Sequence, residues 1–85
     1  MGRVIVRCTT TYSPNQYVEY ISFPANSRVA SKAYQFASHS DAVRFLGCQP
    51  EFVTCLTDSK VQIDRNTIYE ILSPEETLIL TIMDS

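Results

Sequence analysis

The sequence predicts a single α+β domain, in which one main helix packs on one face of a mixed sheet of four to five strands. Three observations lead to this fold class. Alternating apolar residues occur near the start of the chain, apolar residues at helical spacing occur in its middle, and a nearly continuous apolar run occurs close to its end. The 85 residues, of which 45% are hydrophobic and 19% are charged, suffice for one globular domain spanning residues 1–85.

The first part of the chain predicts a β-hairpin. Two β-rich runs, residues 4–9 and 17–23, are separated by the turn signal Ser13-Pro14-Asn15, because proline presets φ and asparagine tolerates the left-handed region. Alternate residues of each strand lie on opposite faces. The residues expected to face the helix are Val4, Val6, Cys8, Ile21 and Phe23. Those expected to face away from it are Ile5, Val18 and Tyr20.

The middle of the chain predicts the main helix. Pro24 ends the second strand, and Asn26 or Ser27 can cap a helix by accepting hydrogen bonds from its free N–H groups. Residues 38–41 favour a cap over a helix interior, so the sequence allows one long helix or two short ones. The apolar helical face, which ends before Gly47, consists of Val29, Ala33, Phe36, Ala37, Val43 and Leu46.

The second half of the chain predicts strands at residues 52–57 and 61–64 and a helical turn at residues 68–72. Residues 77–83 predict the last strand, and their nearly unbroken apolar run is typical of a central strand that is covered on both faces. The first and last strands should therefore pair in parallel at the centre of the sheet. The outward face of the strand at residues 52–57 holds either Val53 and Cys55 or Phe52, Thr54 and Leu56.

In the order and spacing of these segments, the chain resembles the ubiquitin-like β-grasp superfamily over nearly its full length. The resemblance implies a β-grasp sheet with the second strand at its edge. The segments that match the ubiquitin-like superfamily are Val4-Ile5-Val6, Pro24 followed by a capped helix, the turn at residues 64–67 leading into Ile68-Tyr69-Glu70, and the closing strand at residues 76–80. A weaker resemblance to Ras-binding domains covers residues 46–51 and 63–67.

The resemblance does not extend to the functional residues of either family. Ubiquitin and the sulfur-carrier proteins act through a C-terminal Gly-Gly, whereas this sequence ends in Met83-Asp84-Ser85, so a non-conjugatable member is expected. Ras-binding domains present basic residues on the second strand, whereas residues 17–23 contain Glu19 and no base. The resemblance therefore implies the fold and neither activity.

Charge and composition argue against several classes of function. The formal charge is −2 and the seven basic residues are scattered, which does not suit nucleic acid or an anionic membrane surface. Three cysteines, an odd number without a CxxC pair, indicate a reducing and therefore cytoplasmic compartment. Arg3 and Arg7 interrupt the only early apolar run, so we expect no signal peptide, and no stretch reaches the length of a membrane span.

Neither catalysis nor metal binding is predicted. His39, the only histidine, lies beside Ser38 and Asp41, but neighbours on a helix point in different directions and cannot form a catalytic triad. Cys48 and Cys55 do not have the short spacing of structural zinc ligands. We therefore expect no enzyme, no cofactor and no metal. A small cysteine-dependent metal protein or enzyme is the alternative from another class.

The sequence instead predicts a protein-binding surface on the outer sheet face and the edge strand. Edge strands offer unpaired backbone groups for strand addition, and tyrosine suits interfaces. The expected contact residues are Ile5, Val18 and Tyr20, extended by Tyr17 and Tyr12. Glu75 and Glu76 predict either an acidic contact for a basic partner or a solvated corner.

Together these expectations describe a non-enzymatic interaction module that binds a partner protein and acts as a small inhibitor or regulator. A phage or viral host-takeover inhibitor is one form of this function, and a structural subunit of a larger complex is an alternative. The same surface could also pair two copies of the chain as a homodimer, with their edge strands meeting across a twofold axis.

Overall fold

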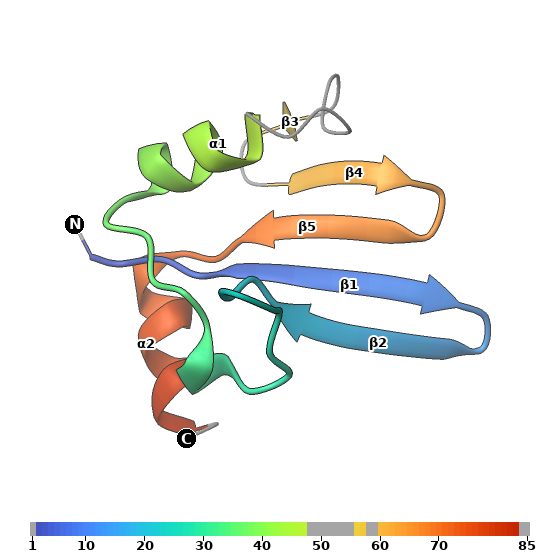
Figure 1. Cartoon of the computed structure of the whole chain (residues 1–85), viewed down its shortest axis with the longest axis horizontal. Coiled ribbons are helices and arrows are strands. Elements are labelled where there is room, and N and C mark those ends of the chain that lie inside the picture. Colours follow the sequence, from blue (N-terminus) through green and yellow to red (C-terminus); the bar gives the residue numbers. More distant parts are fainter. Residues whose placement is uncertain (1, 48–55, 58–59, 84–85) are drawn as a thin grey trace.

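The computed structural model of the chain describes residues 2–47, 56–57 and 60–83. These residues form an α+β fold with a five-stranded sheet, two α-helices and a short 3-10 helix, η1 (Figure 1). The sheet order is β2-β1-β5-β4-β3, and each neighbouring pair is antiparallel. The elements are β1 (Val6–Tyr12), β2 (Asn15–Tyr20), η1 (Ala30–Lys32), α1 (His39–Gly47), β3 (Leu56–Thr57), β4 (Lys60–Asp64), β5 (Thr67–Ile71) and α2 (Pro74–Met83).

The β1–β2 hairpin confirms the first prediction. Its register runs from Arg7 opposite Tyr20 to Tyr12 opposite Asn15. Threonine, valine and tyrosine dominate both strands, and such β-branched and aromatic side chains favour extended backbone. The predicted fourth strand is also confirmed, as β4. The predicted third strand is described only at β3, and the choice between its two outward faces lies outside the described residues.

β5 corrects the helical turn predicted at residues 68–72. Ile68, Ile71 and Leu72 have helical spacing, but the alternation of Tyr69 and Ile71 fits a strand equally well. In the structure this segment pairs with β1 on one side and with β4 on the other. Pairing on both sides satisfies the backbone groups of β5, and this tertiary context selects the strand.

α2 occupies the segment predicted as the last strand, so the prediction of a mixed sheet is wrong. Ser73 caps the helix, since its Oγ accepts a hydrogen bond from the Glu76 N–H (3.1 Å) and donates one to Glu76 Oε1 (3.2 Å). Pro74 stands at the first helical position, where an N–H has no intrahelical partner, and Glu75 and Glu76 lie at the positive end of the helix dipole. The expected parallel pair is not formed, and β1 pairs antiparallel with β2 and β5.

The first half of the predicted main helix is also wrong. Ser27, an expected cap, forms a local turn in which its Oγ accepts a hydrogen bond from the Val29 N–H (3.0 Å). After η1 the chain runs extended, and Phe36 forms a bridge with Val4 through two backbone hydrogen bonds of 2.8 and 3.0 Å. Pairing with the start of the chain therefore replaces helical hydrogen bonds in this segment.

α1 forms the second half of the predicted helix. Ser38 caps it by accepting a 3.1 Å hydrogen bond from the Asp41 N–H, which confirms the capping interpretation of residues 38–41. Arg44 forms a 3.3 Å ion pair with Asp41 one turn earlier. Of the two arrangements that the sequence allowed, neither is formed, because a single short α-helix follows the break.

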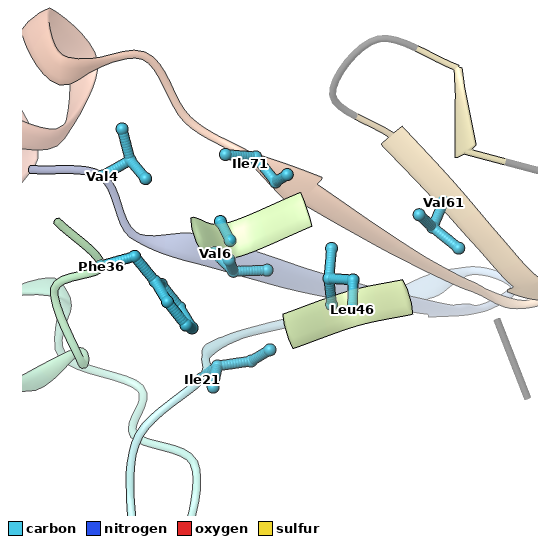
Figure 2. Close-up of a cluster of buried hydrophobic side chains, with 8 residues drawn as sticks. Val4, Val6, Ile21, Phe36, Leu46, Val61 and Ile71 are labelled. Atoms are coloured by element: carbon cyan, nitrogen blue, oxygen red, sulfur yellow. The ribbon is translucent and has the colours of Figure 1, made fainter. Parts of the chain in front are cut away.

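Two hydrophobic clusters cover opposite faces at one end of the sheet. The arrangement predicted from the sequence, with one helix on one face, is therefore wrong. The tips of both hairpins extend past the helices (Figure 1). The cluster under α1 (Figure 2) consists of Val4, Val6, Ile21, Phe36, Ala42, Leu46, Val61 and Ile71. The cluster under η1 and α2 consists of Ile5, Tyr20, Ala30, Ala33 and Leu72, with Leu80 packed against it.

Candidate protein-binding surfaces

The binding patch predicted around Ile5 and Tyr20 is wrong at its centre. Ile5 is fully buried, and Tyr20 is only 6% exposed. Both lie in the cluster under α2, where the Ile5 N–H donates a 3.2 Å hydrogen bond to the Thr77 hydroxyl. The prediction treated this sheet face as uncovered, whereas residues of η1 and α2 cover it at Ile5 and Tyr20.

Three of the predicted contact residues are exposed, namely Tyr12 (57%), Tyr17 (47%) and Val18 (38%). The register places Tyr12 and Tyr17 as diagonal neighbours on one face of the hairpin, and Val18 on the other face. These three side chains therefore flank a strand and do not form one patch. We call them, together with the backbone of residues 15–19, the hairpin edge.

The backbone of β2 is open along part of this hairpin edge. β2 is the outermost strand, and the Ile21 N–H donates a 3.0 Å hydrogen bond to a β1 carbonyl. Because antiparallel pairing alternates, Gln16, Val18 and Tyr20 direct their N–H and C=O groups away from β1. Tyr20 is paired with Ser27 by bonds of 2.7 and 2.9 Å. Within the described part of the chain, no strand pairs with the outward groups of Gln16 and Val18.

Val18 continues into a β-branched row that crosses the neighbouring strands. Val18 lies opposite Thr9, and Thr9 lies opposite Ile68, which is 39% exposed. In the adjacent row Arg7 donates a 2.7 Å hydrogen bond to Glu70 Oε1, and this bond raises the pKa of Arg7. This sheet face thus offers apolar contact beside β2, next to an ion pair that links β1 to β5.

The predicted acidic contact residues, Glu75 and Glu76, are exposed in the first turn of α2. Glu76 takes part in the Ser73 cap, which gives it a structural role. A contact between Glu75 and a basic partner stays a prediction. Glu75 also lines a surface groove of about 490 Å³, together with Gly2, Arg3, Gln35, Pro74, Thr77, Leu78 and Thr81.

The outward side of α2 is an apolar surface that sequence reasoning missed. Four large side chains are exposed there, and we call them the α2 outer face: Leu78 (61%), Ile79 (53%), Ile82 (65%) and Met83 (76%). The side of the helix that packs on the protein instead holds Thr77, which is 4% exposed, and the half-buried Thr81. The helix is therefore polar on part of its inner side and apolar on its outer side, the reverse of an ordinary surface helix.

A cluster of aromatic rings forms a second surface that was not predicted. Phe23, expected to face the helix, is 57% exposed, because β2 ends at Tyr20 and the chain leaves the sheet before Phe23. Its ring meets Tyr34 and Phe45 edge to face, at centroid distances of 5.3 and 5.8 Å. Tyr34 is 48% exposed and contacts Phe36, which joins the cluster to the core. These contacts join the segments at Phe23 and Tyr34 to Phe45 of α1.

The described residues offer few groups for chemistry. His39 is exposed at the first position of α1. Burial raises the pKa of the Cys8 thiol, which favours the unreactive protonated form. Cys48 and Cys55 lie outside the described residues. In residues 2–47, 56–57 and 60–83, no three His, Cys, Asp or Glu side chains are grouped as a metal site would require, and no helix there has the length and apolar character needed to cross a membrane.

Comparisons with known proteins gave no relative. No family model matches the chain, and neither the curated proteins nor the solved structures contain a match. The ubiquitin-like relationship therefore stays a prediction, and function has to be inferred from the surfaces described above.

Proposed function

We propose that this chain is a non-enzymatic interaction module that binds an extended segment of a partner protein beside β2. The observation that supports this function best is the open backbone of β2 at Gln16 and Val18. An added strand can hydrogen-bond to these groups, and main-chain bonds of this kind provide affinity in strand addition. The exposed side chains of Tyr17 and Val18 then supply contacts on the two faces of the added strand.

The side chains along the hairpin edge indicate the chemistry of the bound segment. A strand beside β2 directs alternate side chains to its two faces. On one face they meet Val18 and the row that leads to Ile68, which favours β-branched or other apolar residues. On the other face they meet Tyr17 and Glu19, the only charged side chain of β2, which favours a basic residue.

The accessible edge is short, because Ser27 already occupies the outward groups of Tyr20. Binding should therefore be weak to moderate, in the range of transient interfaces of less than about 1,200 Å². Such binding suits a small cytoplasmic inhibitor or regulator, such as a phage or viral host-takeover protein, better than a permanent subunit. This function does not require the ubiquitin-like relationship, since strand addition needs an accessible edge and not a parallel central pair.

The test is selection from a displayed library of linear peptides, followed by binding measurements on Val18→Pro and Val18→Thr. Proline removes the outward N–H of residue 18 but no bond to β1, so the fold should persist while peptide affinity falls at least about tenfold. Threonine keeps both the N–H and the β-branched shape, and affinity should stay within about threefold.

Amide NMR spectra of the free and peptide-bound protein provide the control for fold and location. The amide signals of Gln16 and Val18 should move most on binding, and a folded spectrum of Val18→Pro is required before its affinity is interpreted. A selected peptide that shifts the signals of α2, or that binds Val18→Pro as tightly as wild type, would contradict binding at the hairpin edge.

A further inference from the structure

We propose that the surface groove beside the start of α2 binds a short peptide with two free ends, its carboxylate at Arg3 and its ammonium group at Glu75. This inference goes beyond the proposed function, because it concerns a different surface and a small ligand. The groove has a volume of about 490 Å³, and sites of roughly 300–1,000 Å³ are those that hold small ligands in proteins.

Two distant parts of the sequence form this groove. Gly2 lies so close to Pro74 that a Cβ atom at residue 2 would stand 3.0 Å from the Pro74 Cβ atom. A few residues later, the Ile5 N–H donates its 3.2 Å hydrogen bond to the Thr77 hydroxyl. These two contacts hold the first residues of the chain beside the first turn of α2 (Figure 1), so Arg3 and Glu75 line one groove although 72 positions separate Ile5 from Thr77.

Opposite charges line the groove without being paired. The side chains of Arg3 and Glu75 are both exposed, and among the described residues neither forms an ion pair or a hydrogen bond. Arg7, by contrast, pairs with Glu70 at 2.7 Å. Because Arg3 and Glu75 do not meet across the groove, a ligand with a carboxylate at one end and an ammonium group at the other can pair with both.

The uncharged lining also suits a peptide. Thr77 is 4% exposed, and within the described part of the chain its hydroxyl accepts the bond from Ile5 and donates none. Such a buried hydroxyl gains a hydrogen bond when a carboxylate or a peptide carbonyl enters the groove. The half-buried Gln35 adds an amide that can bond to a peptide group. Pro74 and Leu78 provide apolar surface for a ligand side chain.

The separation of the two charges favours a dipeptide over a single amino acid. In an α-amino acid the ammonium group and the carboxylate are attached to the same carbon atom. In an extended dipeptide one more residue moves them apart by about 3.5 Å. Two charged side chains that line one groove without meeting therefore fit the two ends of a dipeptide. We expect a dissociation constant on the order of 1 mM, because an open groove contacts only part of so small a ligand.

NMR titration of the purified chain with the dipeptide Leu-Leu tests the proposal. The amide signals of Arg3, Gln35 and Leu78 should shift and saturate by about 10 mM, while those of Gln16 and Val18 stay in place. N-acetyl-Leu-Leu lacks the ammonium group and Leu-Leu-amide lacks the carboxylate, so each should bind at least about fivefold more weakly. Leucine alone should also bind at least about fivefold more weakly.

Substitutions of the two charged side chains test direct contact. Arg3→Gln should weaken Leu-Leu at least about fivefold and leave Leu-Leu-amide within about twofold, because the amide has no carboxylate for Arg3 to bind. Glu75→Gln should act in the same way on Leu-Leu and N-acetyl-Leu-Leu. Arg28→Gln and Glu19→Gln make the same charge changes outside the groove and should leave the affinity for Leu-Leu within about twofold. None of these four side chains is buried, so all variants should keep the wild-type melting temperature within a few degrees.

Four results would overturn this proposal. These are the absence of saturable shifts, equal affinity for Leu-Leu and its capped forms, equal affinity for leucine, and an Arg3→Gln variant that weakens Leu-Leu and Leu-Leu-amide alike. Displayed library peptides are joined to a carrier and lack one of the two free ends, so they do not probe the groove. Folded Val18→Pro should bind Leu-Leu like wild type, so failure at the groove and failure at the hairpin edge give different outcomes.

Discussion

Along the hairpin edge open backbone N–H and C=O groups lie between exposed side chains, whereas the α2 outer face exposes apolar side chains. β2 has a partner strand on one side only, so Gln16 and Val18 keep outward backbone groups. A helix satisfies its interior backbone groups within itself, so α2 offers side chains alone. The hairpin edge should therefore tolerate varied partner sequences with a common extended shape. Binding at the α2 outer face should depend on the buried area and on shape, and charged substitutions there should weaken it.

The two regions also differ in the burial of their side chains, and this difference gives the largest expected change in the free energy of unfolding. Ile5 is fully buried in the cluster under η1 and α2, whereas Tyr17 on the hairpin is 47% exposed. Ile5→Ala should lower the free energy of unfolding by about 2–5 kcal/mol, because it removes buried methyl groups and leaves a cavity. Tyr17→Ala should change it by less than about 1 kcal/mol. Urea denaturation followed by circular dichroism measures both values.

A loss of less than about 1 kcal/mol in Ile5→Ala would show that the cluster around Ile5 is not closely packed in solution. The sheet face at Ile5 would then be as exposed as the hairpin. The backbone bond from Ile5 to the Thr77 hydroxyl is kept in the alanine variant, so the measured loss reports packing alone.

Amide hydrogen exchange should be fast at the outward backbone groups of β2 and slow within α2. The Val18 N–H points away from β1, whereas the N–H groups of Tyr17 and Glu19 point toward it. Val18 should therefore exchange on the order of 100-fold faster than these two neighbours. The amides of Ile79 and Ile82 should be protected although their side chains are exposed, because helical bonds hold them. NMR-detected exchange at low protein concentration gives these rates residue by residue.

Equal exchange of Val18 and Tyr17 would mean that the hairpin edge is covered in solution. If this protection appears only at high concentration, a second copy of the chain provides the cover by pairing with β2. The exchange experiment thus checks the proposed function independently of any substitution.

The sequence predicted the elements whose signals are local. The hairpin and β4 followed from alternation and turn residues. The exposure of Tyr12 and Tyr17 was predicted from their place at the hairpin, and that of Val18 from the alternation that also placed Tyr20 outward, where it is buried. The burial of Ile5 could not be found in this way, because it depends on packing with residues distant in the sequence, such as Ala30 and Leu72. A strand's period gives two faces but does not say which of them another element will cover.

The wrong prediction of residues 77–83 as a strand has a different cause. Residues 77–83 contain isoleucine, leucine and threonine in a continuous run, which favours a buried strand by composition. The signal against this interpretation was present just before the run. Ser73, Pro74 and Glu76 form a helix start with a capping serine, a proline at the first position and a glutamate three residues after the cap. Start signals therefore decided the structure of a segment whose composition was ambiguous.

Ser73→Ala tests this explanation and has the smallest expected effect. The substitution leaves the Glu76 N–H without the hydroxyl that accepts its bond, so it should cost about 1 kcal/mol in the free energy of unfolding. Ser40→Ala is the matched control, because Ser40 lies exposed within α1 and is not its cap, and it should change stability by less than about 0.5 kcal/mol. If the two substitutions have equal effects in urea denaturation, the cap does not select the helix. Packing of Leu80 and Thr77 against the sheet would then be the force that holds residues 74–83 in helical form.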